Sequence, residues 1–145
     1  MQPQDFIKTI YLGDRGCEAI VIDTVKNEVK IKIDEISRIK KGTKVWGYYN
    51  NENIEHGFIV FSGVKFVKLD NAGHLPNGFI VDYKVVGING DLVVIEFEIE
   101  TDYIQKIFVN SGGFKTSEGF NAKLTVSCAS MYLEDPKKPG EKITE

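Results

Sequence analysis

Apolar and polar residues alternate most regularly between residues 79 and 100, and this segment predicts the centre of the fold. Side chains of a strand point alternately to its two faces, so an apolar residue at every second position gives one apolar face. The first half has such a row at Phe79, Val81, Tyr83 and Val85. The second half has one at Val93, Ile95, Phe97 and Ile99. The two rows predict an antiparallel hairpin with one apolar side.

The turn of this hairpin has more than one possible register. A two-residue loop at Asn89–Gly90 would split the apolar rows onto opposite faces. A three-residue loop restores the match, and Ile88–Gly90 is favoured because its glycine accepts the left-handed conformation. The loop Asn89–Asp91 has the same parity and would place Lys84 opposite Glu96. A lone hairpin is marginally stable in water, so further strands are expected to cover the apolar side.

The remaining chain reads mostly as short strands separated by turns. Residues 18–34 predict a second hairpin that turns at Lys26–Glu28. Further strands are predicted at residues 43–49, 58–69, 102–109 and 120–133. Gly63 breaks the alternation within the second of these, which indicates a bulge. Two segments are open between alternatives: residues 4–12 are a short helix or turn or the start of a strand, and residues 35–41 are one helical turn or an edge strand.

This count of elements predicts a mainly β fold with at most one or two short helices. Eight or nine strands with short connections fit a single-domain antiparallel β-sandwich or a partly open barrel. The 145 residues suit one domain, and nine Phe and six Tyr against two Met favour strands over helices. We expect one β-rich domain over residues 1–133. Residues 134–145 form a charged tail containing proline and glycine, either solvated or lying as a strap across the surface.

Charge and composition narrow the classes of partner. With 18 basic and 21 acidic residues the net charge is −3, which lacks the basic excess used to bind a phosphate backbone. Residues 1–12 lack the pattern of a secretory signal, and no apolar run approaches the roughly 20 residues that span a bilayer. We therefore expect a cytoplasmic protein that binds neither nucleic acid nor membrane. Cys17 and Cys128 are expected to be buried, reduced thiols.

Residue types that could carry chemistry are present, but without the spacing that catalysis or metal binding requires. His56 and His74 are the only histidines, and both fall in segments predicted to be exposed loops. No serine or cysteine lies in a nucleophile elbow. Glutamates at alternate positions from 96 to 100 are expected to keep an outward strand face soluble. We assign no catalytic residue, no cofactor and no metal site.

Aromatic and acidic residues gather in one segment, Trp46–Glu55. Tyr and Trp are mostly core residues in β proteins, but beside an acidic loop they are also typical of a recognition surface. A tight turn at Gly13–Gly16 either pairs Asp14 with Arg15 or presents Arg15 to a partner. The candidate partner-binding residues are therefore Trp46, Tyr48, Tyr49, Glu52, Glu55 and Arg15.

Three blocks carry a family resemblance: YLGDR at Tyr11–Arg15, GFIVFSGV at Gly57–Val64 and LEDPKKPGEK at Leu133–Lys142. In this order they resemble a family of short, uncharacterised bacterial proteins. The resemblance implies a bacterial origin and a compact, mostly β domain, and it supplies no site residues. Small acidic bacterial proteins of this kind are often immunity proteins, which block a secreted toxin by surface complementarity.

Three functions follow as hypotheses. The first is a cytosolic binding protein, in its most specific form a toxin-neutralising immunity protein, that uses the surface around Trp46–Glu55. The second is a small-molecule binder or enzyme, which requires a cavity of at least about 300 Å³ with converging polar groups. The third is a structural module that forms a homodimer through a strand edge or an apolar patch.

Overall fold

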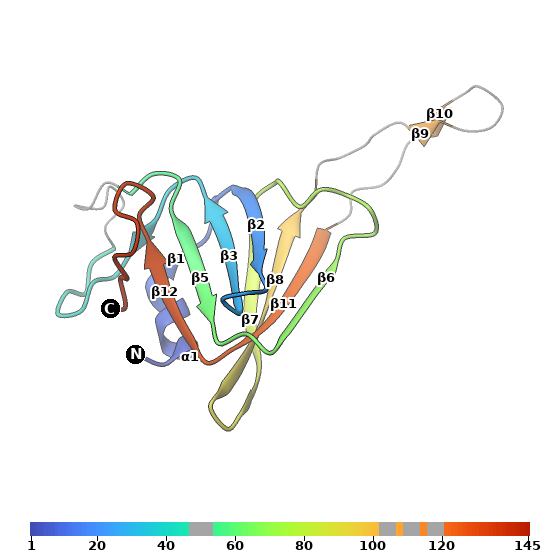
Figure 1. The fold of residues 1–145 in the computed structure, drawn as a ribbon. Coiled ribbons are helices and arrows are strands. Elements are labelled where there is room, and N and C mark those ends of the chain that lie inside the picture. Colours follow the sequence, from blue (N-terminus) through green and yellow to red (C-terminus); the bar gives the residue numbers. More distant parts are fainter. Residues whose placement is uncertain (47–53, 102–106, 109–113, 116–120) are drawn as a thin grey trace.

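The computed structural model describes residues 1–46, 54–101, 107–108, 114–115 and 121–145, and these form a mainly β structure (Figure 1). Two four-stranded antiparallel sheets make up the body, which confirms the expected fold class in its sandwich form. The first sheet has the order β6 (Phe66–Asp70), β11 (Asn121–Cys128), β8 (Leu92–Glu100), β7 (Ile80–Asn89). The second has the order β12 (Ser130–Glu134), β5 (Phe58–Ser62), β3 (Glu28–Ile33), β2 (Cys17–Asp23).

The other described elements are short. The chain begins with α1 (Pro3–Phe6) and the 3₁₀ turn η1 (Ile7–Thr9), and Pro3 suits a first helical turn, where a missing N–H costs nothing. β1 (Ile10–Tyr11) pairs with β4 (Ser37–Arg38), so residues 35–41 contain an edge strand. β9 (Ile107–Phe108) pairs with β10 (Phe114–Lys115). The predicted strand at residues 43–49 is wrong over its described part, where Trp46 makes only an isolated bridge to Ile39.

One bent ribbon of two antiparallel strands runs through both sheets. β5 pairs with β12 in one sheet, and the continuations of these strands, β6 and β11, pair in the other. The chain bends at Gly63, whose φ is +64°, and a Cβ added there would lie 2.9 Å from the Cβ of Ala129. Glycine is required because it tolerates both the left-handed conformation and the close approach. The irregularity predicted at Gly63 is therefore the corner between the two layers.

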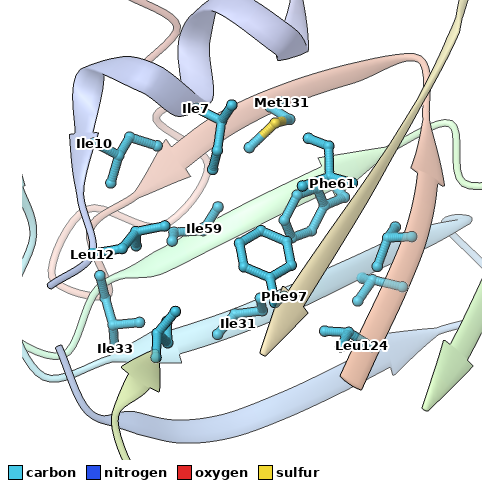
Figure 2. Close-up of a cluster of buried hydrophobic side chains, with 14 of the residues drawn as sticks. Ile7, Ile10, Leu12, Ile31, Ile33, Ile59, Phe61, Phe97, Leu124 and Met131 are labelled. Carbon is cyan, nitrogen blue, oxygen red and sulfur yellow. The ribbon is translucent and has the colours of Figure 1, made fainter. Parts of the chain in front are cut away.

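The core lies between the inner faces of the two sheets (Figure 2). Phe61 of β5 and Phe97 of β8 meet at its centre, with ring centroids 5.5 Å apart and planes inclined at 66°. Edge-to-face pairs of this kind are favourable beyond their burial, by about 0.5–1.5 kcal/mol. The alternating rows predicted inside are buried, among them Val29, Ile31, Ile33, Val93, Ile95, Phe97, Ile99, Ala122, Leu124, Val126 and Cys128.

The central hairpin exists, but the apolar row predicted for its first strand is partly wrong. Ile80, not Val81, is buried, and the side chains of Phe79 and Val81 are 51 % and 50 % exposed. A bulge between Ile80 and Asp82 shifts the register of β7 against β8 and turns Val81 outward. Tyr83, further along β7, is half-buried against the core as predicted. The edge position of β7 permits the bulge, because only one side of the strand must keep a regular ladder.

Both predicted loop positions of the hairpin are wrong. Asn89 pairs with Leu92, so the loop is the two residues Gly90–Asp91, with φ of +60° at Gly90. A positive φ at the first loop position only is the pattern of a type II′ turn. Parity is restored inside the strand by a second bulge between Val85 and Gly87. On the side of this bulge away from the turn, Lys84 lies opposite Glu96, which is the pairing expected for the loop Asn89–Asp91.

The segment after β12 folds back along that strand. Ile143 exchanges two backbone hydrogen bonds with Leu133, at 2.8 and 2.9 Å. The ammonium of Lys142 lies 4.7 Å from the ring centroid of Tyr132, and Arg38 donates to the backbone oxygen of Glu145 at 2.6 Å. The segment therefore lies as a strap along the outer edge of β12. No helix in the described part of the chain has the length and apolar character needed to cross a bilayer.

Candidate functional site

Arg15 lies in a turn that joins the two sheets. The N–H of Arg15 donates to Leu12 at 3.2 Å, and Asp14 adopts a positive φ of 57°. The carbonyl of Arg15 accepts the N–H of Ile80 at 2.9 Å, which fixes the turn against the start of β7. The YLGDR block therefore places Arg15 where the second sheet meets the edge of the first.

The side chain of Arg15 is held by three different contacts. Its Nη2 donates to Ser37 Oγ at 2.8 Å, and its Nη1 lies 3.9 Å from Glu35 Oε2. Its guanidinium carbon lies 5.1 Å from the ring centroid of Tyr11, a favourable cation–π distance. The ion pair proposed between Asp14 and Arg15 is not formed within the described residues. Because the Arg15 side chain is only 13 % exposed, it holds its neighbours in place more than it presents charge to a partner.

Tyr11 and Trp46 form an aromatic pair beside this arginine. Their ring centroids are 5.8 Å apart and their planes are inclined at 71°, an edge-to-face arrangement. A Cβ on Gly13 would lie 2.9 Å from the Tyr11 hydroxyl oxygen, so the glycine leaves room for the ring to lie over the turn. Both aromatic residues are half-buried, so each presents part of its ring to solvent.

A depression of about 270 Å³ lies next to the two rings, and we call it the aromatic hollow. One wall comes from the N-terminal segment and Trp46, and the other from the beginning of β7. Its lining residues are Lys8, Ile10, Tyr11, Leu12, Gly13, Trp46, Ile80, Val81, Asp82 and Tyr83. Exposed Lys8 and Asp82 give it one cation and one carboxylate. Burial and the nearby Asp82 carboxylate raise the pKa of Tyr83, so its hydroxyl stays a neutral hydrogen-bonding group.

The structure brings together some of the predicted partner-binding residues. Trp46 lines the aromatic hollow, and Arg15 packs against the ring of Tyr11, another of its lining residues. Glu55 is exposed and pairs through its backbone with Glu35, the residue whose carboxylate lies near Arg15. Three further predicted residues, Tyr48, Tyr49 and Glu52, lie outside the described residues.

Sequence reasoning missed Tyr11 and the β7 residues of the hollow. The one local signal for the position of Tyr11 is the glycine that follows two residues later. The alternating pattern predicts Val81 in the core, and its place on an exposed wall depends on the bulge at that position.

The other residues considered for chemistry have simple environments. The Nδ1 atom of His56 lies 2.6 Å from Glu18 Oε1 on an exposed surface. Cys17 and Cys128 are buried and free of disulfides. Burial raises the pKa of Cys17 to about 11 and that of Cys128 to about 12, so both stay protonated near neutral pH. Among the described residues no group of three or more His, Cys, Asp or Glu side chains is arranged to hold a metal ion.

The alternating glutamates of β8 lie on the outer face of the first sheet. Glu96 pairs with Lys84 at 3.3 Å, and Glu98 accepts a hydrogen bond from Asn121 at 3.0 Å. The residues between them are core residues, so the alternation keeps one face apolar and the other soluble.

Comparison with known proteins gives a family and no further relative. The model of one family, described as a family of unknown function (DUF6258), matches residues 1–145. Neither the curated proteins nor the solved structures contain a match. The predicted resemblance to an uncharacterised family is confirmed over the whole chain, and the bacterial origin stays a prediction. The chain belongs to the family of unknown function DUF6258.

Proposed function

We propose that this chain is a protein-binding protein whose aromatic hollow accepts a side chain of its partner. The observation that carries the proposal is the meeting of Tyr11 and Trp46 at one depression, with Arg15 packed against the Tyr11 ring. Tyr and Trp, the two ring residues that line it, are among the residue types that contribute most to binding energy at protein interfaces. Their rings are fixed by packing, so little conformational freedom is lost when a partner binds.

The size of the hollow favours a protein partner. Small-molecule sites usually have volumes of about 300–1,000 Å³ and enclose most of the ligand. At about 270 Å³ the hollow lies just below this range, and an open depression of this size fits one apolar or aromatic side chain. An anchor side chain in a preformed pocket is the usual centre of a protein interface.

Charged residues near the hollow would orient the partner. Lys8 and Asp82 line it with opposite charges, and Glu55 is exposed close to the Glu35–Arg15 pair. Charges at the rim of an interface change the association rate and the choice of partner more than they change the affinity. A partner with a complementary pair of charges on either side of its anchor residue would therefore be preferred.

Neutralisation of a toxin in a bacterial cell is the specific form of this proposal. An immunity protein needs a stable scaffold and a complementary surface, and it blocks its target without reacting with it. A rigid β-sandwich with a half-exposed Trp–Tyr pair meets this need. Co-expression with a toxin encoded by a neighbouring gene should restore growth, and Trp46→Ala should reduce this rescue.

A cross-linking experiment tests the binding proposal. A photo-reactive amino acid placed at Val81, on the wall of the hollow, should give one discrete adduct in cells that produce the protein naturally. Trp46→Ala should lower the yield at least about tenfold, since truncating an anchor aromatic often costs 2 kcal/mol or more of binding free energy. Phe66→Ala is the matched control, because Phe66 is an exposed aromatic on the opposite edge of the first sheet.

The result can also go against the proposal. Equal adduct yields from the wild-type chain, Trp46→Ala and Phe66→Ala would show that the hollow does not hold the partner. Thermal unfolding of each variant establishes that a loss of cross-linking is not a loss of fold.

A further inference from the structure

Most of the outer edge of β7 is unpaired among the described residues. β7 is ten residues long and lies at the end of its sheet. On the side away from β8 its first residue, Ile80, donates to Arg15 and the preceding Phe79 bridges Gly16, and the rest of this edge has no strand partner among the described residues. An unpaired strand edge offers its backbone N–H and C=O groups to another strand. We propose that β7 pairs antiparallel with β7 of a second copy of this chain, which would join two first sheets into one eight-stranded sheet.

The charges of β7 select a second copy as the occupant. Asp82 and Lys84 flank Tyr83, and both are exposed on the outer face of the sheet. In a symmetric antiparallel pair centred on Tyr83, Asp82 lies opposite Lys84 of the second copy, and Lys84 lies opposite its Asp82. Residues directly opposite on one face have Cβ atoms about 4.5–5.5 Å apart, within reach of an ion pair. Two identical β7 strands would therefore form two ion pairs, each between Asp82 of one copy and Lys84 of the other.

Asp82 also lacks a positive partner within one chain. It lies directly opposite Glu98 of β8, and like charges in this position destabilise a sheet. Among the described residues it makes no ion pair, whereas Lys84 pairs with Glu96 at 3.3 Å. Its Oδ1 accepts the N–H of Tyr83 at 2.8 Å, so this carboxylate must turn from that N–H to Lys84 of the second copy when the ladder forms. Lys84 of a second copy would supply the missing positive charge.

Exposed apolar side chains lie at both ends of this central stretch. Val81 is 50 % exposed at one end, and Val86 and Ile88 are 55 % and 58 % exposed at the other. Figure 1 shows the turn end of the β7–β8 hairpin extending beyond the two sheets, where no other strand covers it. In an antiparallel pair centred on Tyr83, Val81 of one copy lies opposite Val85 and next to Val86 of the other. The pairing stops there, because Arg15 and Gly16 occupy the edge beside Ile80 and Phe79. The apolar residues of each chain would then cover those of its partner.

The two bulges of β7 restrict the pairing to one register. They lie between Ile80 and Asp82 and between Val85 and Gly87, so the regular part of the strand is short. Bulges prevent indiscriminate pairing of a strand edge. Here they leave Asp82–Val85 as the stretch on which a ladder can form, with Tyr83 near its centre. The expected product is a closed dimer and not a chain of subunits.

This inference goes beyond the proposed function and does not rest on it. Val81, Asp82 and Tyr83 also line the aromatic hollow, so a second copy and another protein partner compete for the same part of β7. By mass action, a partner that binds the hollow would draw the chain out of the dimer.

Sedimentation equilibrium of the purified protein, alone in solution, is the test. The wild-type chain should show concentration-dependent association from 16.3 kDa to twice that mass, with a Kd on the order of micromolar. Asp82→Lys and Lys84→Glu each replace two attractions with two repulsions, and each alone should weaken the dimer about tenfold or more. An equimolar mixture of the two variants should dimerise again, because every introduced charge then faces its opposite.

Asp70→Lys is the matched control, since Asp70 is an exposed carboxylate on β6, at the far edge of the same sheet. It should dimerise like the wild-type chain. A wild-type chain that stays monomeric at about 200 μM overturns the proposal, whatever the variants do. If the wild-type chain dimerises and either Asp82→Lys or Lys84→Glu dimerises equally well, the pairing at Tyr83 is overturned. A mixture of the two variants that does not dimerise overturns it as well. In the cross-linking test of the hollow, the dimer would give an adduct between two copies of this chain at Val81, and mass spectrometry distinguishes it from an adduct with another protein, so that neither test decides the other.

Discussion

At the scale of single residues, Arg15 shows how one side chain organises a site. It lies between the ring of Tyr11, the hydroxyl of Ser37 and the carboxylate of Glu35. A planar guanidinium can meet all three at once, because it stacks with its face and donates with its edge. A lysine ammonium at the same place could keep the charge but not this combination of contacts. The position of Tyr11, and with it one wall of the hollow, therefore depends on an arginine.

Replacement of this arginine should destabilise the fold. We expect Arg15→Lys to lower the free energy of unfolding by about 1–2 kcal/mol, because the hydrogen bond to Ser37 and the stacking on Tyr11 are lost. Urea denaturation measures this change. Lys68→Ala, at an exposed cation on β6, should stay within about 0.5 kcal/mol of the wild-type value. An Arg15→Lys chain as stable as the wild type would show that the three contacts contribute nothing.

The buried thiols make stability depend on pH at the alkaline end. Burial raises the pKa of Cys128 to about 12, above its ordinary value of 9.0. The unfolded chain therefore releases this proton first, and the stability present below pH 9 is lost as the pH rises toward 12. Between pH 8 and pH 10 we expect a loss on the order of 1 kcal/mol from this group, measured by urea unfolding at each pH.

A variant isolates the thiol from other groups that titrate in this range. Cys128→Ala should be less stable at every pH because it leaves a small cavity, but its stability should fall less steeply between pH 8 and pH 10 than that of the wild type. Parallel curves for the two proteins would contradict the buried, protonated state of Cys128.

At the scale of elements, a comparison of Gly63 with Gly73 distinguishes two causes of strain in a substituted glycine. Its φ of +64° disfavours any side chain, and an added Cβ would also meet the Cβ of Ala129 at 2.9 Å. Gly73 has a φ of +84° but nothing within 4 Å of an added Cβ. We expect Gly73→Ala to cost about 1 kcal/mol, and Gly63→Ala clearly more, about 2–4 kcal/mol. If thermal unfolding shows the same loss of stability for both variants, the chain at Gly63 has room to accept a Cβ.

Some elements are predictable from sequence and others are not, for a physical reason. β3, β8 and β11 have neighbours on both sides and one face in the core, so their regular alternation predicts which residues are buried. β7 has one free edge, which permits two bulges, and each bulge reverses which residues face inward. The glycine turn was recognised as a turn, but its register depends on a bulge four residues away.

At the scale of the whole molecule, the site is built from segments that are distant in sequence. Tyr11, Trp46 and Val81 meet because the turn around Arg15 ties the start of β2 to the start of β7. Local patterns cannot show such a meeting, although Trp46 and Arg15 were both singled out by residue type and surroundings. The two sheets are connected by the bent ribbon at Gly63 and by this tie at Arg15, and the hollow lies beside the second connection.

The fluorescence of Trp46 tests the central claim most directly, because it is the only tryptophan of the chain. When the cross-linked partner is purified and added, we expect the emission of Trp46 to shift to shorter wavelength and its quenching by acrylamide to fall to about half, since an anchor side chain would exclude water from the ring. Partner binding that changes neither the emission nor the quenching of Trp46 would contradict the claim that the aromatic hollow is the binding site.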